Sequence, residues 1–531
     1  MYKKFTTIVR RATDLAVFLG LICVWAAGQS QLLVPGGAPV RFRAESGERP
    51  MAATAGSSAA VEFMTSKYVT GLEPVATAEG DFNHDGKVDI VTANFHDGTV
   101  GVLLGKGNGT FKPVLFSEAG SYPQALAVGD FNGDGKEDLL VIDEAAEACC
   151  SASSVVFLPG NGDGTFGAPV TIATFPTVGL NLATSVVAAD FNGDGKLDFA
   201  VAIGSNQITD EQADPGEVIL FLGQGNGTFQ QSTILNTTGY PYTLTVADLN
   251  KDGTPDLVVN NITYYGTSLW VYLGNGDGTF KSPIRNAPLY DNALSVVVAD
   301  MNGDGNLDLI AGAEYGLFVI LGNGNGTFQN PGPYAAGYGT GQVVVADFNG
   351  DGLPDVAMPD FNVGLDILLN AGYGTGGLGV PTFYSLPGAT PNTELAAIGV
   401  ASFSGQLPGS ADILMTDAAG ESYGTGFDVY LMRNLGATKM TLSASPKTSQ
   451  PGQTVTFTAK VTGAVKGAGQ PTGSITFENG STKLGTVTLV NGVVTLQYSE
   501  LATGSQKIVA VYSGDSYFNA ATSATLTEKV K

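Results

Sequence analysis

The sequence predicts an all-β protein, a seven-bladed β-propeller followed by a β-sandwich. Three observations lead to this prediction. An acidic loop, DFNGDGKLD at 190–198, has six copies that begin at residues 81, 130, 190, 248, 300 and 347. Intervals of about 50 residues are typical of four-stranded propeller blades. A glycine-rich turn such as LGNGDGTF recurs in step with the loops, and the last 94 residues, 438–531, lack both motifs.

Composition supports a β protein and limits its partners. The chain has 531 residues, of which 73 are glycine, and a formal net charge of −24. Three Asp in each of six loops account for 18 of the 49 acidic residues, and the remaining 31 nearly balance the 25 Lys and Arg. A surface this acidic repels phosphate backbones, so we expect no nucleic-acid partner.

The N-terminus has the features of a secretory signal peptide over residues 1–28. Four basic residues precede the apolar stretch LAVFLGLICVWAAG, and small residues end it. The stretch is short for a membrane span, which needs about 20 apolar residues. We therefore expect a secreted or cell-surface protein without a membrane span after signal removal, while an uncleaved anchor stays open. Residues 29–60, rich in Ala, Gly and Ser, are the expected linker.

Two adjacent cysteines, Cys149 and Cys150, would remain after signal removal. Neighbouring residues cannot tie distant elements of one chain together. A vicinal disulfide and two free thiols are both compatible with an oxidising compartment.

The expected propeller covers residues 61–437. In each unit an apolar strand such as VVVADFN leads into the acidic loop, which is followed by a second strand such as PDLVVN. A variable connection reaches a third strand, and Asn-Gly or Asp-Gly pairs then form a tight turn to the fourth. The seventh unit, starting near Val400, lacks the acidic pattern and its own fourth strand. We expect VEFMTSKYVTG at 61–71 to supply that strand and close the ring.

The loop chemistry is that of a hard cation, which takes about six to eight oxygen ligands. The sixth position is always Gly, which favours a sharp turn with positive φ. The seventh position varies in side chain, so its backbone carbonyl is the expected donor. The full set of candidate ligands, at positions one, three, five, seven and nine, is Asp81, Asn83, Asp85, Lys87, Asp89, Asp130, Asn132, Asp134, Lys136, Asp138, Asp190, Asn192, Asp194, Lys196, Asp198, Asp248, Asn250, Asp252, Thr254, Asp256, Asp300, Asn302, Asp304, Asn306, Asp308, Asp347, Asn349, Asp351, Leu353 and Asp355.

Together, DFNGDGKLD and LGNGDGTF resemble the FG-GAP/VCBS repeat family, related to the integrin alpha propeller. Over residues 61–437 the resemblance implies a seven-bladed propeller with Ca²⁺ in about six loops. No site is carried over to the seventh blade, where Ser402 and Ser404 replace the first two ligands. The stretches PTGSITF and VAVYSGDSYF make residues 438–531 similar to bacterial Ig-like repeats of surface proteins. The predicted fold is therefore a β-propeller followed by an Ig-like β-sandwich.

The sequence offers little for catalysis. Its two histidines, His84 and His96, both lie in the first blade, and no nucleophile elbow, zinc motif or phosphate loop is present. We expect a binding or adhesion protein. The alternative is a polysaccharide lyase or hydrolase that uses carboxylates at the propeller axis.

Hairpins alternate between the two faces of a propeller, so the acidic loops and the glycine-rich turns should share one face. The variable connections should then form the opposite face and bind an extracellular glycan or protein, with the chain acting as a monomer. Exposed aromatic side chains on irregular loops suit such recognition. The candidate contact residues are Phe95, Tyr264, Tyr265, Tyr315, Phe361 and Tyr423.

Overall fold

The computed structural model describes residues 61–531, with gaps at 145–151, 177–180, 206–215, 264–265, 287–288, 290, 314, 335, 337–340, 350, 361–363, 373–376, 387–392, 394, 404–410, 419–427, 436–437, 464–469 and 516–517. The expected signal peptide and linker lie outside the described residues, as do Cys149 and Cys150. No helix occurs among the described residues, and so none there is long and apolar enough to cross a membrane.

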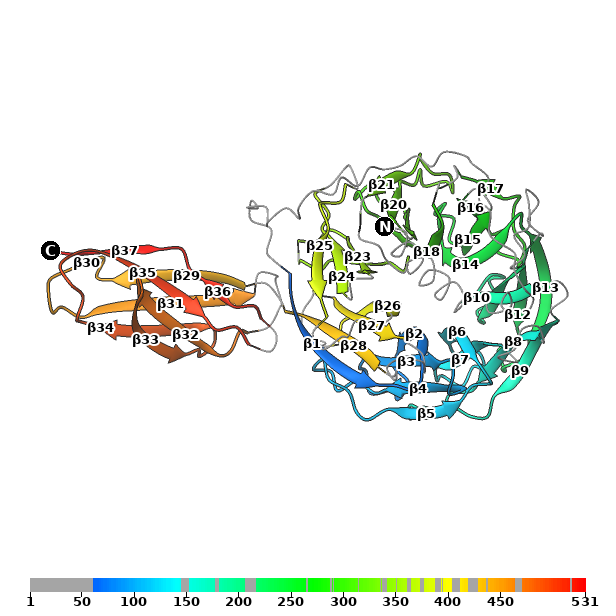
Figure 1. Ribbon diagram of the computed structural model, residues 1–531, viewed down its shortest axis with the longest axis horizontal. Coiled ribbons are helices and arrows are strands. Elements are labelled where there is room, and N and C mark those ends of the chain that lie inside the picture. The colour runs from blue at the N-terminus through cyan, green and yellow to red at the C-terminus, as the bar shows by residue number, and fades with distance from the viewer. Residues whose placement is uncertain are drawn as a thin grey trace, which may run out of the picture. The chain divides into compact units, whose positions relative to one another are not determined.

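Seven four-stranded antiparallel sheets are arranged around a common axis (Figure 1). The first three are β2(Pro74–Gly80), β3(Asp89–Asn94), β4(Thr99–Leu103), β5(Leu115–Glu118); β6(Pro123–Gly129), β7(Asp138–Glu144), β8(Ala152–Leu158), β9(Val170–Pro176); and β10(Asn181–Ala189), β11(Asp198–Ser205), β12(Glu217–Gly223), β13(Phe229–Asn236). The next three are β14(Tyr240–Ala247), β15(Asp256–Thr263), β16(Gly266–Tyr272), β17(Ile284–Arg285); β18(Ala293–Ala299), β19(Asp308–Ala313), β20(Gly316–Ile320), β21(Gly332–Tyr334); and β22(Val344–Ala346), β23(Asp355–Asp360), β24(Gly364–Leu368), β25(Thr382–Ser385). We call these sheets blades one to six in chain order.

The seventh blade joins the two ends of the propeller sequence. It contains β26(Leu395–Ala401), β27(Asp412–Asp417) and β28(Asp428–Leu435), and its outermost strand is β1(Glu62–Val69). Strands β1 and β28 pair antiparallel from Glu62↔Leu435 to Val69↔Asp428. The expectation that 61–71 completes the last blade is confirmed, and the ring closes without leaving that blade one strand short.

The propeller core lies between neighbouring blades rather than inside them. Seven separate clusters of buried apolar side chains each join two successive blades, and one of them joins blade seven to blade one through Phe403 and Phe111. The second strand of a blade is covered on both faces, so β3, β19, β23 and β27 are buried at every position. This explains why the apolar residues of these strands follow one another without alternation, as in DLIAGA of β19 and DILMTD of β27.

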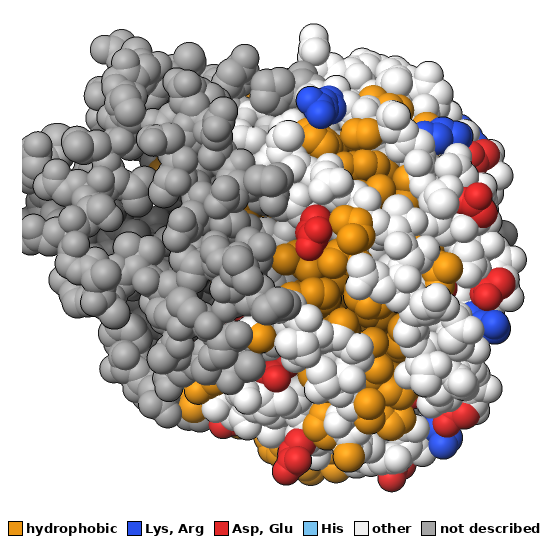
Figure 2. Space-filling view, turned by 90° about the vertical axis from the view of Figure 1, so that its right-hand side faces the viewer, with side chains coloured by type: hydrophobic (Ala, Val, Ile, Leu, Met, Phe, Trp, Pro, Cys, Tyr) orange, Lys and Arg blue, Asp and Glu red, His pale blue; other side chains and the backbone are white. Residues whose placement is uncertain are grey.

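The outer strands form the rim of the propeller and are partly apolar. Phe116 on β5, Val170 on β9 and Ile234 on β13 are 51%, 50% and 44% exposed. A view onto one side of the rim shows a band of hydrophobic side chains, with many of the charged side chains gathered toward one margin (Figure 2).

The C-terminal part is a β-sandwich. One sheet has the order β29-β31-β34, and the other β30-β37-β35-β32-β33, with β36 paired to β35. Alternate residues of both sheets point inward, and Phe457, Phe477, Ile508 and Tyr512 are fully buried between them. The strands are β29(Thr438–Ser445), β30(Thr448–Ser449), β31(Val455–Gly463), β32(Ser474–Asn479), β33(Thr482–Thr488), β34(Val493–Tyr498), β35(Gly504–Tyr512), β36(Ala521–Thr522) and β37(Leu526–Val530).

Candidate metal centre

Each acidic loop connects the first and second strands of its blade, and two positions turn it back sharply. The glycine at position six has a φ between 77° and 89° in all six loops, as expected from the sequence. A Cβ atom on Gly135 or Gly195 would meet nothing within 4 Å, so the backbone conformation alone requires glycine there. Position four is also left-handed in the five loops where it is described, which the sequence did not indicate. Gly133 has a φ of 76°, whereas His84 and Lys251 adopt 56° and 62° without being glycine.

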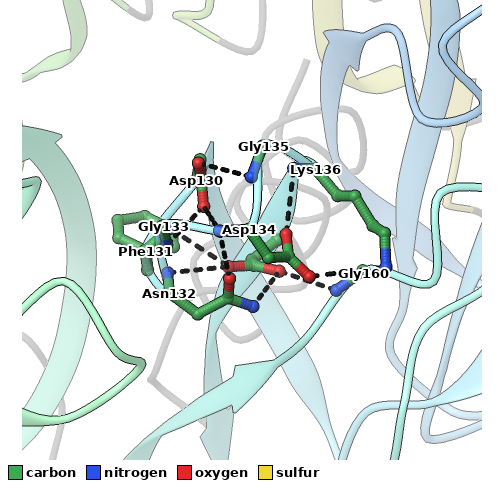
Figure 3. Close-up of polar contacts among 9 residues, drawn as sticks. Asp130, Phe131, Asn132, Gly133, Asp134, Gly135, Lys136 and Gly160 are labelled. Carbon is green, nitrogen blue, oxygen red and sulfur yellow. Dashed lines mark hydrogen bonds and ion pairs between the residues drawn. The ribbon is translucent and has the colours of Figure 1, made fainter.

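The loop wraps around the side chain of its first residue (Figure 3). In the second blade, Oδ1 of Asp130 accepts hydrogen bonds from the backbone N–H groups of Gly133 and Asp134 at 2.7 and 3.1 Å, and Oδ2 accepts one from Gly135 at 2.9 Å. Asn132 Oδ1 accepts from Asp134 N–H at 2.8 Å, and Asp134 Oδ1 from Lys136 N–H at 3.0 Å. The bonds to positions five, six and seven recur in all six loops.

The ninth residue differs from the other acids because it is fully buried. Oδ2 of Asp138 accepts the N–H of Phe131 at 3.0 Å, and Oδ1 accepts the N–H of Gly160 at 2.7 Å. One carboxylate therefore ties the acidic loop to the glycine-rich turn of the same blade. The equivalent residues, each 0% exposed, make the same two bonds in every blade: Asp89, Asp138, Asp198, Asp256, Asp308, Asp355 and Asp412.

Asp412 belongs to the seventh blade, which lacks the rest of the acidic pattern. Its Oδ2 accepts the N–H of Phe403 at 3.1 Å, and its Oδ1 accepts the N–H of Asn434 at 2.8 Å. The ninth acid therefore has a structural role that does not depend on the other acids of the loop.

The same part of the loop also contacts the next blade. The carbonyl of Phe131 accepts a hydrogen bond from Gly227 N–H in the turn of the third blade, at 3.0 Å, and its ring meets that of Phe229 edge-on with centroids 5.9 Å apart. Phe82, Phe191 and Phe403 make the same two contacts with the turns that follow them. We call this arrangement the interblade lock. It confirms that loops and turns share one face, and it explains why the two motifs recur in step.

At the first glycine of the turn, the backbone of its own blade comes so close that a side chain would clash with it. A Cβ atom at Gly160 would lie 2.1 Å from the carbonyl oxygen of Glu137. The sixth and seventh blades have Asn370 and Asn434 at this place. Each uses its side-chain amide to bond the loop of the preceding blade, Asn370 to Met301 O at 2.8 Å and Asn434 to Phe348 O at 2.7 Å. In these two blades the side-chain amide of asparagine therefore donates the interblade hydrogen bond that a backbone N–H of glycine donates in other turns.

Burial and mutual repulsion raise the pKa of the ninth carboxyls. Desolvation is the main cause, hydrogen bonds from the backbone oppose it, and the charges of other acids in the same loop add to it. The pKa of Asp89, Asp138 and Asp198 rises to about 6 and that of Asp355 to about 7. In the first loop the negative charges of Asp85 and Asp81 raise the pKa of Asp89, so the three acids lie within electrostatic reach of one another.

The loops fit a calcium ion in their chemistry, because each offers carboxylate, amide and backbone oxygens and no soft ligand. In the first loop each oxygen of the ninth carboxylate, Asp89, accepts one backbone hydrogen bond and keeps a further lone pair, whereas both oxygens of Asp138 accept an additional bond from Asn132. Within the described parts of the chain, however, no three or more His, Cys, Asp or Glu side chains come together as a ready metal site. The carboxylates of the first, fifth and ninth residues are turned to backbone N–H groups instead. Calcium binding by these loops therefore stays a prediction.

The aromatic residues expected to contact a ligand differ in their exposure. Phe95 is buried, 3% exposed, and packs against the rings of His96 and Tyr122 with centroids 5.1 Å away. Its prediction as an exposed contact residue is therefore wrong, because the short β3–β4 connection folds this side chain inward. Tyr315, between β19 and β20, is 57% exposed as expected. The other four candidates lie outside the described residues, namely Tyr264, Tyr265, Phe361 and Tyr423.

Comparison with known families identifies both parts of the chain. The FG-GAP-like repeat matches residues 81–141, 147–201, 209–259, 262–311 and 300–358, and the FG-GAP repeat matches 182–221. The chain is an FG-GAP repeat protein. A bacterial Ig-like domain (group 3) matches residues 442–531 of this FG-GAP repeat protein, which agrees with the β-sandwich found there.

The curated relatives of the FG-GAP repeats include integrin alpha chains. Human integrin alpha-7 is 36% identical over 89 residues, which is 15% of this chain and 8% of that protein. Integrin alpha-PS5 of Drosophila melanogaster is 30% identical over 146 residues, 24% of this chain and 14% of that protein. The chain thus spans a small part of the length of these relatives.

Two solved structures show partial likeness to the FG-GAP repeat protein. One, titled for recognition of non-reducing terminal N-acetylglucosamine by an Agrocybe aegerita lectin, has a TM-score of 0.40 at 21% identity and covers 59% of this chain and 80% of its own. The other, the Dos1 propeller, has a TM-score of 0.39 at 13% identity and covers 65% and 75%. Because both scores are low, the architecture described above rests on this chain's own sheets.

Proposed function

We propose that this FG-GAP repeat protein is an exported binding or adhesion protein, stabilised by calcium, that holds an extracellular glycan or protein on the face opposite the acidic loops. The observation that supports this most is the contrast between the two faces. On one face the same loop and turn recur from blade to blade and are tied into interblade locks. Residues committed to such repeated contacts are poorly placed to evolve a specific ligand site.

The opposite face is built from connections of unequal length. Between the second and third strands, two residues separate Thr263 from Gly266, whereas 11 separate Ser205 from Glu217. Loops carried on a rigid scaffold are where binding residues concentrate. This face therefore has the variation that recognition needs, while the locks hold the scaffold in place.

Calcium would be held by the first, third and fifth side chains, the seventh carbonyl and the ninth carboxylate of each of six loops. When bound, it supplies positive charge that cancels the repulsion among these acids. The chain itself then contributes the geometry, since the ninth carboxylate fixes the loop to the turn of its own blade and the second residue contacts the turn of the next blade. An exported protein meets calcium at about 10⁻³ M, the range in which extracellular modules bind it.

The likeness to integrin alpha chains supports a place at the cell surface or outside the cell. The N-terminal sequence supports export, because it has the basic and apolar regions of a signal peptide. We propose binding rather than catalysis, since the loop carboxylates are engaged with backbone N–H groups.

A glycan array, read with the calcium-loaded chain, tests this proposal. Once a ligand is found, Tyr315→Ala should weaken its binding, because Tyr315 is the described candidate that is exposed on the variable face. Phe116→Ala is the matched control, since this aromatic side chain is similarly exposed, 51%, but lies on the rim strand β5.

Unchanged affinity in Tyr315→Ala together with loss in Phe116→Ala would contradict the proposed face. Release of shortened products from a polysaccharide would contradict binding without catalysis and would favour a lyase or hydrolase.

A further inference from the structure

The six acidic loops differ in the ammonium groups near their carboxylates. In the first three loops the lysine at position seven reaches the fifth residue of its own loop. Lys87 Nζ lies 2.9 Å from Asp85 Oδ2, and the equivalent distances for Lys136 and Lys196 are both 3.4 Å. The fifth loop has Asn306 at this position. It receives an ammonium group from a different blade.

That group belongs to Lys251, the fourth residue of the fourth loop. Its Nζ donates a hydrogen bond to Asn306 Oδ1 at 2.8 Å. It also lies 3.9 Å from the place of a Cβ atom on Gly305. Lys251 therefore reaches across the seam between the fourth and fifth blades and stands over the neighbouring loop.

The position of Lys251 is conformationally unfavourable for a lysine. Its φ is 62°, and glycine occupies the same left-handed position in other loops at Gly133, Gly193 and Gly303. An L-residue costs conformational free energy in this region, so the backbone of the fourth loop favours glycine over lysine there. The contact that the side chain makes lies in the next loop.

An ammonium group therefore already stands beside the fifth loop, whose first, fifth and ninth residues are acidic.

We infer that Lys251 is a tethered counter-cation of the fifth loop, whose positive charge opposes the binding of a divalent cation there and so lowers the calcium affinity of that loop from the neighbouring blade. This inference rests on the proposed binding of calcium by the acidic loops. It makes the six sites unequal, and it makes one of them dependent on a residue outside its own loop.

Calcium titration of the full chain by calorimetry, at low salt, tests the inference. Lys251→Gly removes the ammonium group and restores the residue that other loops have at this position. We expect one site to bind calcium about two- to fivefold more tightly, the range for a single exposed charge contact. Because such contacts are screened, the gain should shrink as salt is added.

Two further variants assign the effect. His84→Gly makes the same backbone change at position four of the first loop and removes no lysine ammonium group. It should leave the calcium affinities unchanged. Asp304→Ala removes a ligand of the fifth loop, and in that background Lys251→Gly should have no effect on the remaining sites.

The outcomes separate the inference from the proposed function. If the wild-type chain binds calcium and Lys251→Gly titrates like the wild type, the inference is wrong and the calcium proposal stands. If the gain persists in the Asp304→Ala background, Lys251 does not act on the fifth loop. If the wild-type chain binds no calcium, both are overturned.

Discussion

At the scale of single residues, one loop combines two tasks that different acids perform. The first, third and fifth side chains accept hydrogen bonds from backbone N–H groups of their own loop, as Asp190, Asn192 and Asp194 do in the third blade. The ninth, Asp198, is buried and joins loop to turn through two backbone N–H groups. The sequence does not separate these tasks, because both use aspartate.

Substitution of the seventh-blade acid isolates the structural task. Asp412→Ala leaves the N–H groups of Phe403 and Asn434 buried without their acceptor, and each such group costs about 1–3 kcal/mol. For the two groups together we expect the unfolding free energy to fall by about 2–6 kcal/mol, equally with and without calcium, and the number of bound calcium ions to stay unchanged. Denaturant titrations in calcium and in chelator measure both. A loss seen in calcium alone would show that the acid acts through the metal.

Asp194→Ala is the matched change for the other task. It removes one exposed ligand and leaves the buried carboxylate of Asp198 in place. With calcium about tenfold above its dissociation constant, one site contributes about 1.4 kcal/mol. We expect a loss near this value in calcium, a much smaller one in chelator, and one fewer bound ion. Equal losses in both conditions would speak against a metal ligand.

The left-handed position four gives a prediction that needs no calcium. His84 has a φ of 56° and an exposed side chain. His84→Gly relieves the left-handed penalty of about 1–2 kcal/mol but gains chain entropy in the unfolded state, so the net stabilisation should be about 0.5–1 kcal/mol. Thermal unfolding measures it. A lower melting temperature would contradict the backbone argument.

At the scale of elements, the acidic loop and the glycine-rich turn form the lock between blades. Phe191 is a well-packed example of this lock. The residue is 2% exposed, and its ring meets that of Phe280 in the next blade edge-on, with centroids 5.8 Å apart. The equivalent positions in the fourth and fifth blades are Leu249 and Met301, which are equally buried. The lock thus requires an apolar side chain of this size.

Truncation of this side chain should open one seam. Phe191→Ala should cost about 3–5 kcal/mol, as large-to-small changes in a core do. Phe191→Leu, which copies the fourth blade, should cost less than about 1.5 kcal/mol. Unfolding curves of both variants test the lock. Equal losses in the two would mean that position two does not fill a packed interface.

The repeat period and the patterning of the loop predicted the propeller and the positive φ of the sixth glycines, because these depend on local sequence. The closing strand β1 was predicted by counting strands, because the seventh unit lacks a fourth strand of its own and residues 61–71 belong to no other unit. The interblade lock could not be predicted, since its partners are backbone groups in the following blade. Phe131 and Gly227 lie far apart in sequence and meet only after the ring has formed. The error at Phe95 has a similar cause, because the exposure of an aromatic ring on a short turn depends on neighbours such as Tyr122.

At the scale of the whole molecule, the ring depends on a strand from its own beginning. Deletion of residues 61–71 would remove β1 and leave the outer edge of β28 unpaired. It would also remove Val61 from the cluster that joins blades six and seven. We expect a lower melting temperature of the propeller and more aggregation, because open edges recruit other strands. An unchanged melting temperature would refute the closure.

The buried acids make the metal-free ring sensitive to pH. Because the pKa of Asp89, Asp138 and Asp198 is about 6 in the folded chain and about 4 when unfolded, the folded state holds protons that the unfolded state has released. Their stabilising contribution is full below about pH 4 and is lost as pH rises through 6.

We therefore expect the melting temperature in chelator to fall between pH 5 and pH 7, and this fall to be smaller in calcium, where the ionised acids are paired. Melting curves at several pH values measure it. A rise of the melting temperature over the same range in chelator would contradict the burial of these acids.

We propose that the acidic loops are calcium sites that hold the propeller together. Six independent sites, each contributing about 1.4 kcal/mol, would add roughly 8 kcal/mol, comparable to the net stability of a typical domain. Scanning calorimetry of the full chain with calcium and with chelator is the most direct measurement. We expect chelation to lower the melting temperature of the propeller strongly. The melting temperature of the Ig-like domain, which has no such loop, should stay unchanged. A propeller transition at the same temperature in both conditions would contradict this proposal.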